Sequence, residues 1–186
     1  MPQTRNVAIL VGSLRKGSYN KMAAKVLQDV APSHLTFETL DIGGLPFYNQ
    51  DAEENPYESW VHFREKVKAS DAILFVSPEY NRSIPAVLKN AIDIGSRPPP
   101  KNVWRGKPCA VATVSIGATS AMASAFVIRQ TLVAVGLACL PQPEVYLGKA
   151  ADLFDENGAL RKDDTREFLR KFMAAFGKWI ETIHGE

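Results

Sequence analysis

The sequence has few cysteines and histidines and no long apolar run, and each shortage excludes a class of protein. Its two cysteines, Cys109 and Cys139, lie in apolar stretches, so we expect reduced core residues of a cytoplasmic protein and no disulfide. The three histidines lie far apart without the spacing of metal ligands, so no metal site is predicted. No run approaches the roughly 18 apolar residues of a membrane-spanning helix. We also expect no signal peptide, because residues 1–6 lead directly into an apolar strand.

An excess of charge of one sign is also missing. The chain has 22 Lys and Arg residues against 20 Asp and Glu residues, a formal net charge of +2, in scattered positions that favour no nucleic-acid partner. It has 186 residues, is 46% hydrophobic and shows neither an internal repeat nor a linker. These features predict a single domain over residues 1–186.

The most distinctive stretch is a polar loop between an apolar segment and a helical pattern. Five apolar residues, 7–11, predict a strand that is buried on both faces. The loop that follows, 12–20, carries the hydroxyls of Ser13 and Ser18, the guanidinium of Arg15 and the amide of Asn20. The N–H groups and the dipole of the next helix point at the same place. Together these donors suit a phosphate monoester.

Other phosphate-binding loops do not match this one. Gly12 and Gly17 have the spacing of the nucleoside-triphosphate loop, but Ser18 occupies the position of its lysine. The G-x-G-x-x-G fingerprint of dinucleotide-binding folds is absent, and so is the cysteine nucleophile of a phosphotyrosine-phosphatase loop. An ordinary polar turn between a strand and a helix remains the alternative.

Apolar periodicity predicts five strands that alternate with five helices. The strands are predicted at 5–11, 34–40, 72–76, 108–116 and 137–140, and the helices at 18–30, 57–69, 85–94, 121–135 and 163–183. Gly95 and Gly136 are expected to end the third and fourth helices. The alternation predicts an α/β fold with a five-stranded parallel sheet in the order 2-1-3-4-5, covered by helices on both faces.

This strand order brings three unusual loops to one edge of the sheet. Loops 12–20, 77–85 and 115–120 follow the first, third and fourth strands, and ligands of such folds bind outside the carboxyl ends of these strands. A longer loop, 41–56, has three possible roles: a wall of the site, a subunit contact or a surface excursion.

The loop after the third strand suits a flat ring. Pro78 fixes one backbone angle, Tyr80 offers an aromatic face, and Asn81 offers both a hydrogen-bond donor and an acceptor. The backbone N–H groups of residues 79–81 are expected to point at ring heteroatoms. We therefore expect a planar ligand group beside the phosphate site.

Two features of this edge have alternative interpretations. Glu79 and Arg82 also fit a plain proline-containing turn whose charges are solvated. Ser115 and Gly117 offer little side-chain bulk and would close the far side of a ring site, but Ser115 equally fits an ordinary strand-end hydroxyl.

A phosphate site beside a site for a planar ring describes flavin mononucleotide (FMN). The NAD(P)H-dependent FMN reductase family carries motifs that resemble GSLRKGSYN at 12–20 and PEYN at 78–81. Within that family the chain is most similar to the bacterial quinone and chromate reductases. The resemblance covers nearly the whole chain, including LKNAID at 88–93.

The resemblance implies a flavodoxin-like three-layer fold that binds FMN non-covalently and uses NAD(P)H as co-substrate. It also implies ping-pong hydride transfer through the flavin N5 to quinones, chromate or other small acceptors, with no side chain as general acid or base. Arg82 is expected to attract anionic substrates, with a solvated or interfacial role as the alternative. The residues implied to bind the cofactor are Ser13, Arg15, Ser18, Tyr19, Asn20, Pro78, Glu79, Tyr80, Asn81 and Ser115.

Family members form homodimers or homotetramers, so the resemblance also implies a homo-oligomer. The chain departs from its relatives after the fourth strand, where they often carry a glycine-rich stretch with an arginine. Ala123 stands at that arginine position and Phe126 at a nearby tyrosine position. This departure weakens the expectation of a tetramer contact and leaves the expectation of flavin binding unchanged.

Three other functions are compatible with an α/β fold of this kind. A flavodoxin-type electron carrier without NAD(P)H oxidase activity is disfavoured, because such carriers are usually strongly acidic and this loop carries Arg15 and Lys16. A phosphoacceptor regulatory domain is disfavoured because Ser77 and Pro78 stand where its aspartate would end the third strand. A flavin-dependent redox sensor remains open.

Overall fold

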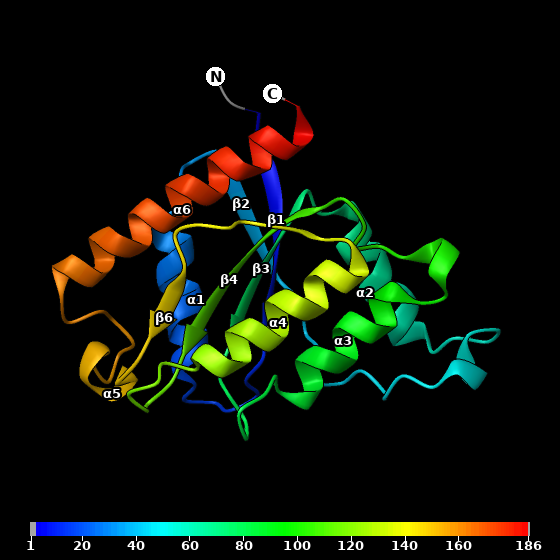
Figure 1. Ribbon diagram of the computed structural model, residues 1–186, viewed down its shortest axis with the longest axis horizontal. Coiled ribbons are helices and arrows are strands. Elements are labelled where there is room, and N and C mark those ends of the chain that lie inside the picture. The colour runs from blue at the N-terminus through cyan, green and yellow to red at the C-terminus, as the bar shows by residue number, and fades with distance from the viewer. Residues whose placement is uncertain (1–2, 186) are drawn as a thin grey trace.

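A parallel β-sheet forms the middle layer of the protein, whose computed structural model describes residues 3–185. The strands are β1 (Arg5–Val11), β2 (Leu35–Thr39), β3 (Ala72–Ser77), β4 (Pro108–Val114), β5 (Ala138–Cys139) and β6 (Val145–Leu147). Their order is β2-β1-β3-β4-β5, and β6 also pairs with β4 (Figure 1). The predicted α/β fold and the strand order 2-1-3-4-5 are confirmed. The predicted domain spans 1–186, of which residues 1, 2 and 186 lie outside the described residues.

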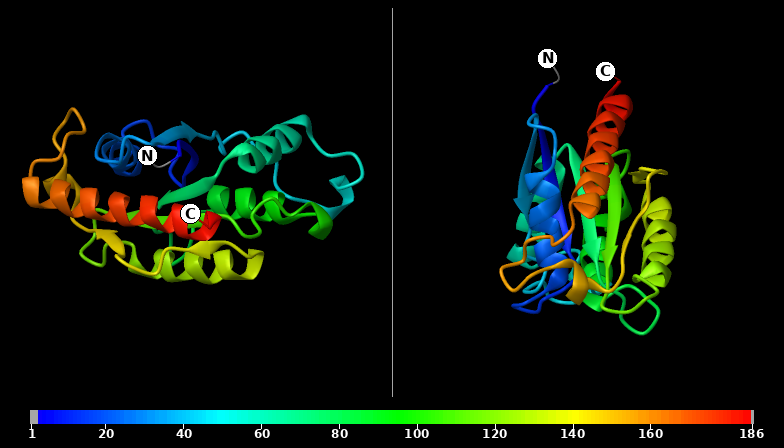
Figure 2. Two further views of the ribbon diagram at one scale, coloured as in Figure 1. Left: turned by 90° about the horizontal axis from the view of Figure 1, so that it is seen from above. Right: turned by 90° about the vertical axis from the view of Figure 1, so that its left-hand side faces the viewer.

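Helices cover both faces of the sheet, as the left panel of Figure 2 shows. One face packs against α1 (Tyr19–Asp29) and α6 (Asp163–His184), and the other against α2 (Glu58–Ala69), α3 (Ala86–Ser96) and α4 (Met122–Val135). Shorter helical segments are η1 (Gln50–Ala52), η2 (Pro99–Lys101) and α5 (Ala150–Leu153). None of the described helices is long and apolar enough to cross a membrane.

Side chains of the central strands alternate between the two apolar layers. In β1, Val7 and Ile9 pack on the side of α1 and α6, whereas Ala8 and Leu10 pack on the side of α2 and α3. All four are at most 1% exposed. Burial on both faces explains why these strands read as unbroken apolar runs.

A sixth strand corrects the prediction of five. The strand predicted at 137–140 is the two-residue β5, and β6 lies beyond it in a segment where no strand was predicted. The two strands pair with opposite ends of β4. Pro141 and Pro143 lie between them. Proline has no backbone N–H for the ladder, so the pairing is interrupted there and resumes at Val145.

Gly95 does not end α3, which corrects a second prediction. The helix continues to Ser96, and a Cβ atom at Gly95 would lie 2.4 Å from the ring of the buried Trp104. The glycine is needed for this close packing. Gly136 does end α4 as expected, with a φ of 83° that is typical of a glycine cap.

Candidate active site

The three loops predicted to converge do meet, at the lower edge of the sheet in Figure 1. They enclose a cavity of about 220 Å³ beyond the carboxyl ends of β1, β3 and β4. Every residue predicted to bind the cofactor lines this cavity, except Asn81. The lining residues are Ser13, Arg15, Ser18, Tyr19, Asn20, Pro78, Glu79, Tyr80, Val114, Ser115 and Ile116.

The end of the cavity that is predicted to take a phosphate is formed by the start of α1 and by residues 12–20, which we call the phosphate loop after this prediction. Ser18 is the N-cap, and its Oγ accepts a hydrogen bond from the backbone N of Asn20 at 3.2 Å. The first turn of α1 carries no acidic residue, so the positive end of its dipole is not offset there. Ser13 and Ser18 are buried, whereas Arg15 is exposed and makes no ion pair with any described residue. This set of donors fits a phosphate group.

Asn20 connects the phosphate loop to the neighbouring strand. Its Nδ2 donates to the carbonyl oxygen of Val114 at 3.3 Å, and its side chain is buried. The Oδ1 atom is also buried and has no hydrogen-bond partner among the described residues. A buried acceptor without a donor is costly, so this oxygen fits a ligand hydroxyl better than a phosphate oxygen.

A tight turn holds the shape of residues 77–85, which we call the ring loop after the planar ligand group predicted there. Tyr80 and Ser83 exchange backbone hydrogen bonds of 3.1 and 3.0 Å, and Asn81 and Arg82 between them have φ values of 51° and 64°. The prediction that the N–H groups of residues 79–81 all point at a ring is therefore wrong for Tyr80, whose N–H is used inside the turn. This turn also carries Asn81 away from the cavity lining.

Glu79 is fixed by contacts that the sequence did not reveal. Its Oε2 accepts a hydrogen bond from the backbone N of Ser124 at 3.3 Å, and its Oε1 lies 3.6 Å from Nη1 of Arg82. The Glu79 side chain is 11% exposed and that of Arg82 is 74% exposed. Glu79 is thus a structural part of the site and not a solvated charge, whereas Arg82 is open to solvent as expected.

Gly12 allows the phosphate loop and the ring loop to approach each other closely. A Cβ atom there would lie 3.1 Å from Ser77 Oγ and 3.3 Å from Pro78 Cδ. On the far side, Ser115 Oγ accepts a hydrogen bond from the backbone N of Gly117 at 3.1 Å. Ser115 is therefore both a satisfied strand-end hydroxyl and part of the cavity wall.

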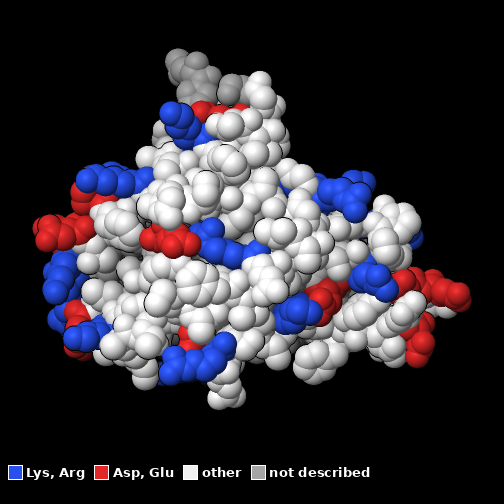
Figure 3. Space-filling model, in the orientation of Figure 1, with Lys and Arg blue, Asp and Glu red and all other residues white. Residues whose placement is uncertain are grey.

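An apolar surface adjoins the cavity mouth and continues along α4. Its members are Tyr80, Ile116, Met122, Phe126 and Val133, which are between 42% and 72% exposed. The surface over α4 is mostly free of charged side chains in Figure 3. We call this set the α4 apolar surface.

Comparison with known proteins decides the family. Residues 5–152 match the family model of NADPH-dependent FMN reductases. The chain belongs to this family. It is 50% identical over 182 residues to a quinone reductase of Pseudomonas putida, a match covering 97% of each chain. It is 33% identical over 187 residues to a quinone reductase of Escherichia coli, a match covering 98% of this chain and 99% of the relative.

Solved structures agree with this assignment. The flavoenzyme NAD(P)H:(acceptor) oxidoreductase FerB from Paracoccus denitrificans superposes with a TM-score of 0.90 at 40% identity, over 96% of this chain and 98% of FerB. A flavodoxin from Pseudomonas aeruginosa gives a TM-score of 0.58 at 20% identity, which shows the shared flavodoxin-like fold alone. As a member of this reductase family, the chain is an oxidoreductase that uses FMN and NAD(P)H.

Proposed function

We propose that this reductase transfers reducing equivalents from NAD(P)H through FMN to quinones, with chromate and other small acceptors as further substrates. The observation that carries the proposal is the single cavity shared by the phosphate loop and the ring loop. The names of the P. putida and E. coli relatives supply the substrate class. A flavodoxin-type carrier without NAD(P)H oxidase activity is the competing function that the experiment below must exclude.

The donors and acceptors of the cavity divide between two ends of FMN. We assign the phosphate to Ser13, Arg15 and Ser18 with the first turn of α1, and we place Tyr19 beside it. The unpaired Oδ1 of Asn20 is assigned to a hydroxyl of the ribityl chain. The flavin ring is assigned to Pro78, Glu79, Tyr80 and Ser115, which line the cavity, and no ring contact is assigned to Asn81, which lies outside the lining. When bound, FMN supplies the hydride-accepting and electron-donating chemistry, and the protein supplies position and electrostatics.

The open side of the cavity is where NAD(P)H and the acceptor would approach. Tyr80 is 48% exposed there, and the guanidinium of Arg82 stands in solvent beside it. A positive charge at the mouth raises the local concentration of anionic substrates. No described side chain is assigned as a general acid or base.

We also propose a homo-oligomer of single-domain subunits in the cytoplasm. The α4 apolar surface supports this proposal, because monomeric proteins rarely leave several large apolar side chains exposed in one place. Phe126, at 57% exposure, lies within it and replaces the tyrosine expected in relatives. An apolar contact would take the place of a polar one.

The decisive experiment follows the visible spectrum of the purified protein and then its reaction with NADPH or NADH and a quinone. We expect a flavin spectrum, bleaching by the nicotinamide and recovery on addition of the quinone. A protein that stays colourless with excess FMN would refute the cofactor site. A flavin that is bound but is not reduced by NADPH or NADH would favour the carrier function.

A matched pair of variants assigns the phosphate end. Arg15→Ala removes a cation that lines the cavity, whereas Lys16→Ala removes the neighbouring cation that does not line it. We expect FMN affinity to fall roughly tenfold for Arg15→Ala, as for loss of a charge-assisted hydrogen bond, and to stay near the original value for Lys16→Ala. Equal effects would contradict the assignment of Arg15.

A further inference from the structure

A second cavity lies at the opposite end of the sheet from the flavin site. It has a volume of about 580 Å³ and lies between α2 and the segment that runs from η2 to the start of β4. The seven residues of β4 separate the two cavities, which corresponds to about 20 Å along the strand. The second cavity is therefore independent of the cofactor site.

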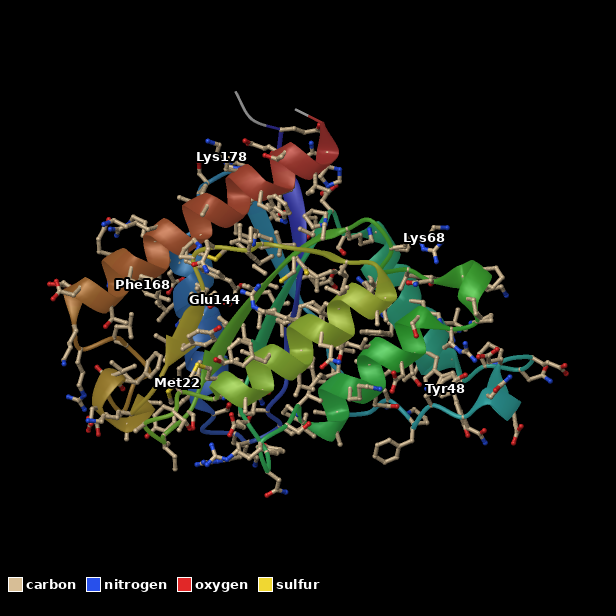
Figure 4. All side chains as sticks on the ribbon, in the orientation of Figure 1. Met22, Tyr48, Lys68, Glu144, Phe168 and Lys178 are labelled. Atoms are coloured by element: carbon tan, nitrogen blue, oxygen red, sulfur yellow. The ribbon has the colours of Figure 1, made fainter. Side chains whose placement is uncertain are left out.

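Five cations line this cavity, and a single carboxylate, that of Glu65, lines it with them. The cations are Arg64, Lys68, Lys101, Arg105 and Lys107. None of the five forms an ion pair with a described residue, whereas Lys66, Lys89 and Arg97 nearby each have a carboxylate partner. Figure 4 labels Lys68, and Figure 3 shows basic side chains at the corresponding place on the upper right of the molecule. In a chain of net charge +2, this gathering creates a local positive field.

Two of these cations are held in place by main-chain carbonyl groups. Lys107 Nζ donates to the carbonyl oxygens of Lys68 at 3.1 Å and Ser70 at 2.5 Å, at the end of α2. Arg64 Nε donates to the carbonyl oxygen of Ile94 at 3.0 Å. These contacts position both cations without neutralising them, so a ligand would meet a preorganised wall.

The Arg64 guanidinium retains an unused donor. Its Nη2 is buried and has no hydrogen-bond partner among the described residues. Burial lowers the pKa of Arg64 although Glu53 opposes the shift, and burial likewise lowers the pKa of Lys107 against the opposing effect of Asp71. For both cations the cost of burial outweighs the nearby acidic groups, and an anionic oxygen in the cavity would favour their charged forms.

Apart from the carboxylate of Glu65 and the amide of Asn102, the rest of the lining is apolar, which restricts the class of ligand. Pro56, Val61, Pro100 and Val103 contribute carbon surface beside the cations. A free inorganic anion would make no contact with these apolar side chains. The cavity volume also lies within the roughly 300–1,000 Å³ that is typical of small-molecule sites. We propose that this cavity binds a small organic anion with an apolar body and a phosphate, sulfonate or carboxylate head.

The test uses the FMN-loaded protein and isothermal titration calorimetry with anilinonaphthalene sulfonate, a probe of this chemistry. FMN occupancy keeps the probe out of the flavin site. We expect the probe to bind saturably to the original protein. Combining Lys101→Glu and Arg105→Glu should weaken its affinity about tenfold or more, because these exposed positions would then repel the sulfonate instead of attracting it. Lys68→Glu, on α2, provides a second variant that approaches the same cavity from the opposite wall.

The matched control combines Lys25→Glu and Lys178→Glu, which change the net charge equally at exposed positions on α1 and α6 (Figure 4 labels Lys178). The control should bind the probe as the original protein does. Uncharged N-phenylnaphthylamine should bind weakly and should not respond to the charge reversal. Equal binding by the reversal and control variants, or equal affinity for the uncharged probe, would overturn the proposal. All variants should keep FMN and NADPH oxidation, so the result is separate from the proposed function.

Discussion

The Glu79 carboxylate caps the start of α4 by accepting the backbone N–H of Ser124, 45 residues later in the chain, at 3.3 Å. The first residues of α4 have no cap of their own, because the N-cap position is held by Ala121 in a left-handed conformation with no side-chain hydrogen bond. The ring loop and α4 therefore support each other. A substitution at Glu79 should therefore alter the conformation of the ring loop and also destabilise the first turn of α4.

Removing this cap should weaken FMN binding. We expect Glu79→Ala to cost about 1 kcal/mol, roughly a fivefold loss in FMN affinity, because the loop loses its anchor and α4 loses its cap. Glu79→Gln keeps an oxygen acceptor and should retain most of the affinity. Titration of the apoprotein by flavin fluorescence measures both. If Glu79→Ala binds FMN as tightly as the original protein, the capping contact does not order the site.

Arg82 should affect substrates and not the cofactor. Its guanidinium is 74% exposed at the cavity mouth, so Arg82→Ala should raise KM for anionic acceptors about threefold or more and leave FMN affinity unchanged. Neutral quinones should show little change. Steady-state kinetics with ferricyanide and with a neutral quinone make the comparison, and Lys178→Ala serves as an exposed control. Unchanged kinetics with ferricyanide would remove Arg82 from the substrate site.

Replacing Gly95 by alanine should reveal how closely α3 packs against the Trp104 ring. Replacing a helical glycine by alanine usually stabilises a protein by about 0.5–1 kcal/mol. Here the new Cβ would lie 2.4 Å from the Trp104 ring, so Gly95→Ala should instead destabilise by about 2 kcal/mol. Gly44→Ala, where a Cβ meets nothing within 4 Å, should stay within about 0.5 kcal/mol. Urea unfolding measures both, and equal stability of the two variants would contradict this account.

Local sequence patterns were enough to predict the strand order and the meeting of the three loops, whereas the phosphate site itself stays a prediction. Ser18 does cap α1, and the loops after β1, β3 and β4 do share one cavity, because alternating strands and helices leave few arrangements of a parallel sheet. The contact between Glu79 and Ser124 was not predicted, because neither segment contains a sequence feature that indicates a hydrogen-bond partner 45 residues away.

The other errors have the same origin in long-range packing. Gly95 looked like a helix end, and only the position of the Trp104 ring explains why the helix continues. The basic cavity brings together Arg64 and Arg105, which are separated in the sequence by two helices and a strand. The charges are scattered along the sequence, so the cavity could not be predicted from it. Pro141 and Pro143 do follow the predicted fifth strand at 137–140, since proline interrupts a ladder, but β6, where the pairing with β4 resumes, was not predicted.

The two cysteines offer a prediction about pH. Cys109 and Cys139 are register partners on β4 and β5, and both are free thiols. Arg129 Nη1 lies 3.4 Å from Cys139 Sγ. A hydrogen bond with the Cys109 thiol and the positive charge of Arg129 lower the pKa of Cys139 against the opposing effect of burial, whereas burial raises the pKa of Cys109.

A lowered pKa means that the thiolate of Cys139 is present at a lower pH than in an ordinary cysteine. The rate of alkylation by iodoacetamide should therefore reach its half-maximum below the usual value of about 8.5, and Cys139 should react before the buried Cys109. Arg129→Met removes the stabilising charge, so the midpoint should move to higher pH, and Cys139→Ser should abolish the fast phase. Mass spectrometry of timed samples locates the label. A midpoint at or above the ordinary value, or one that Arg129→Met leaves in place, would show that the guanidinium does not stabilise the Cys139 thiolate.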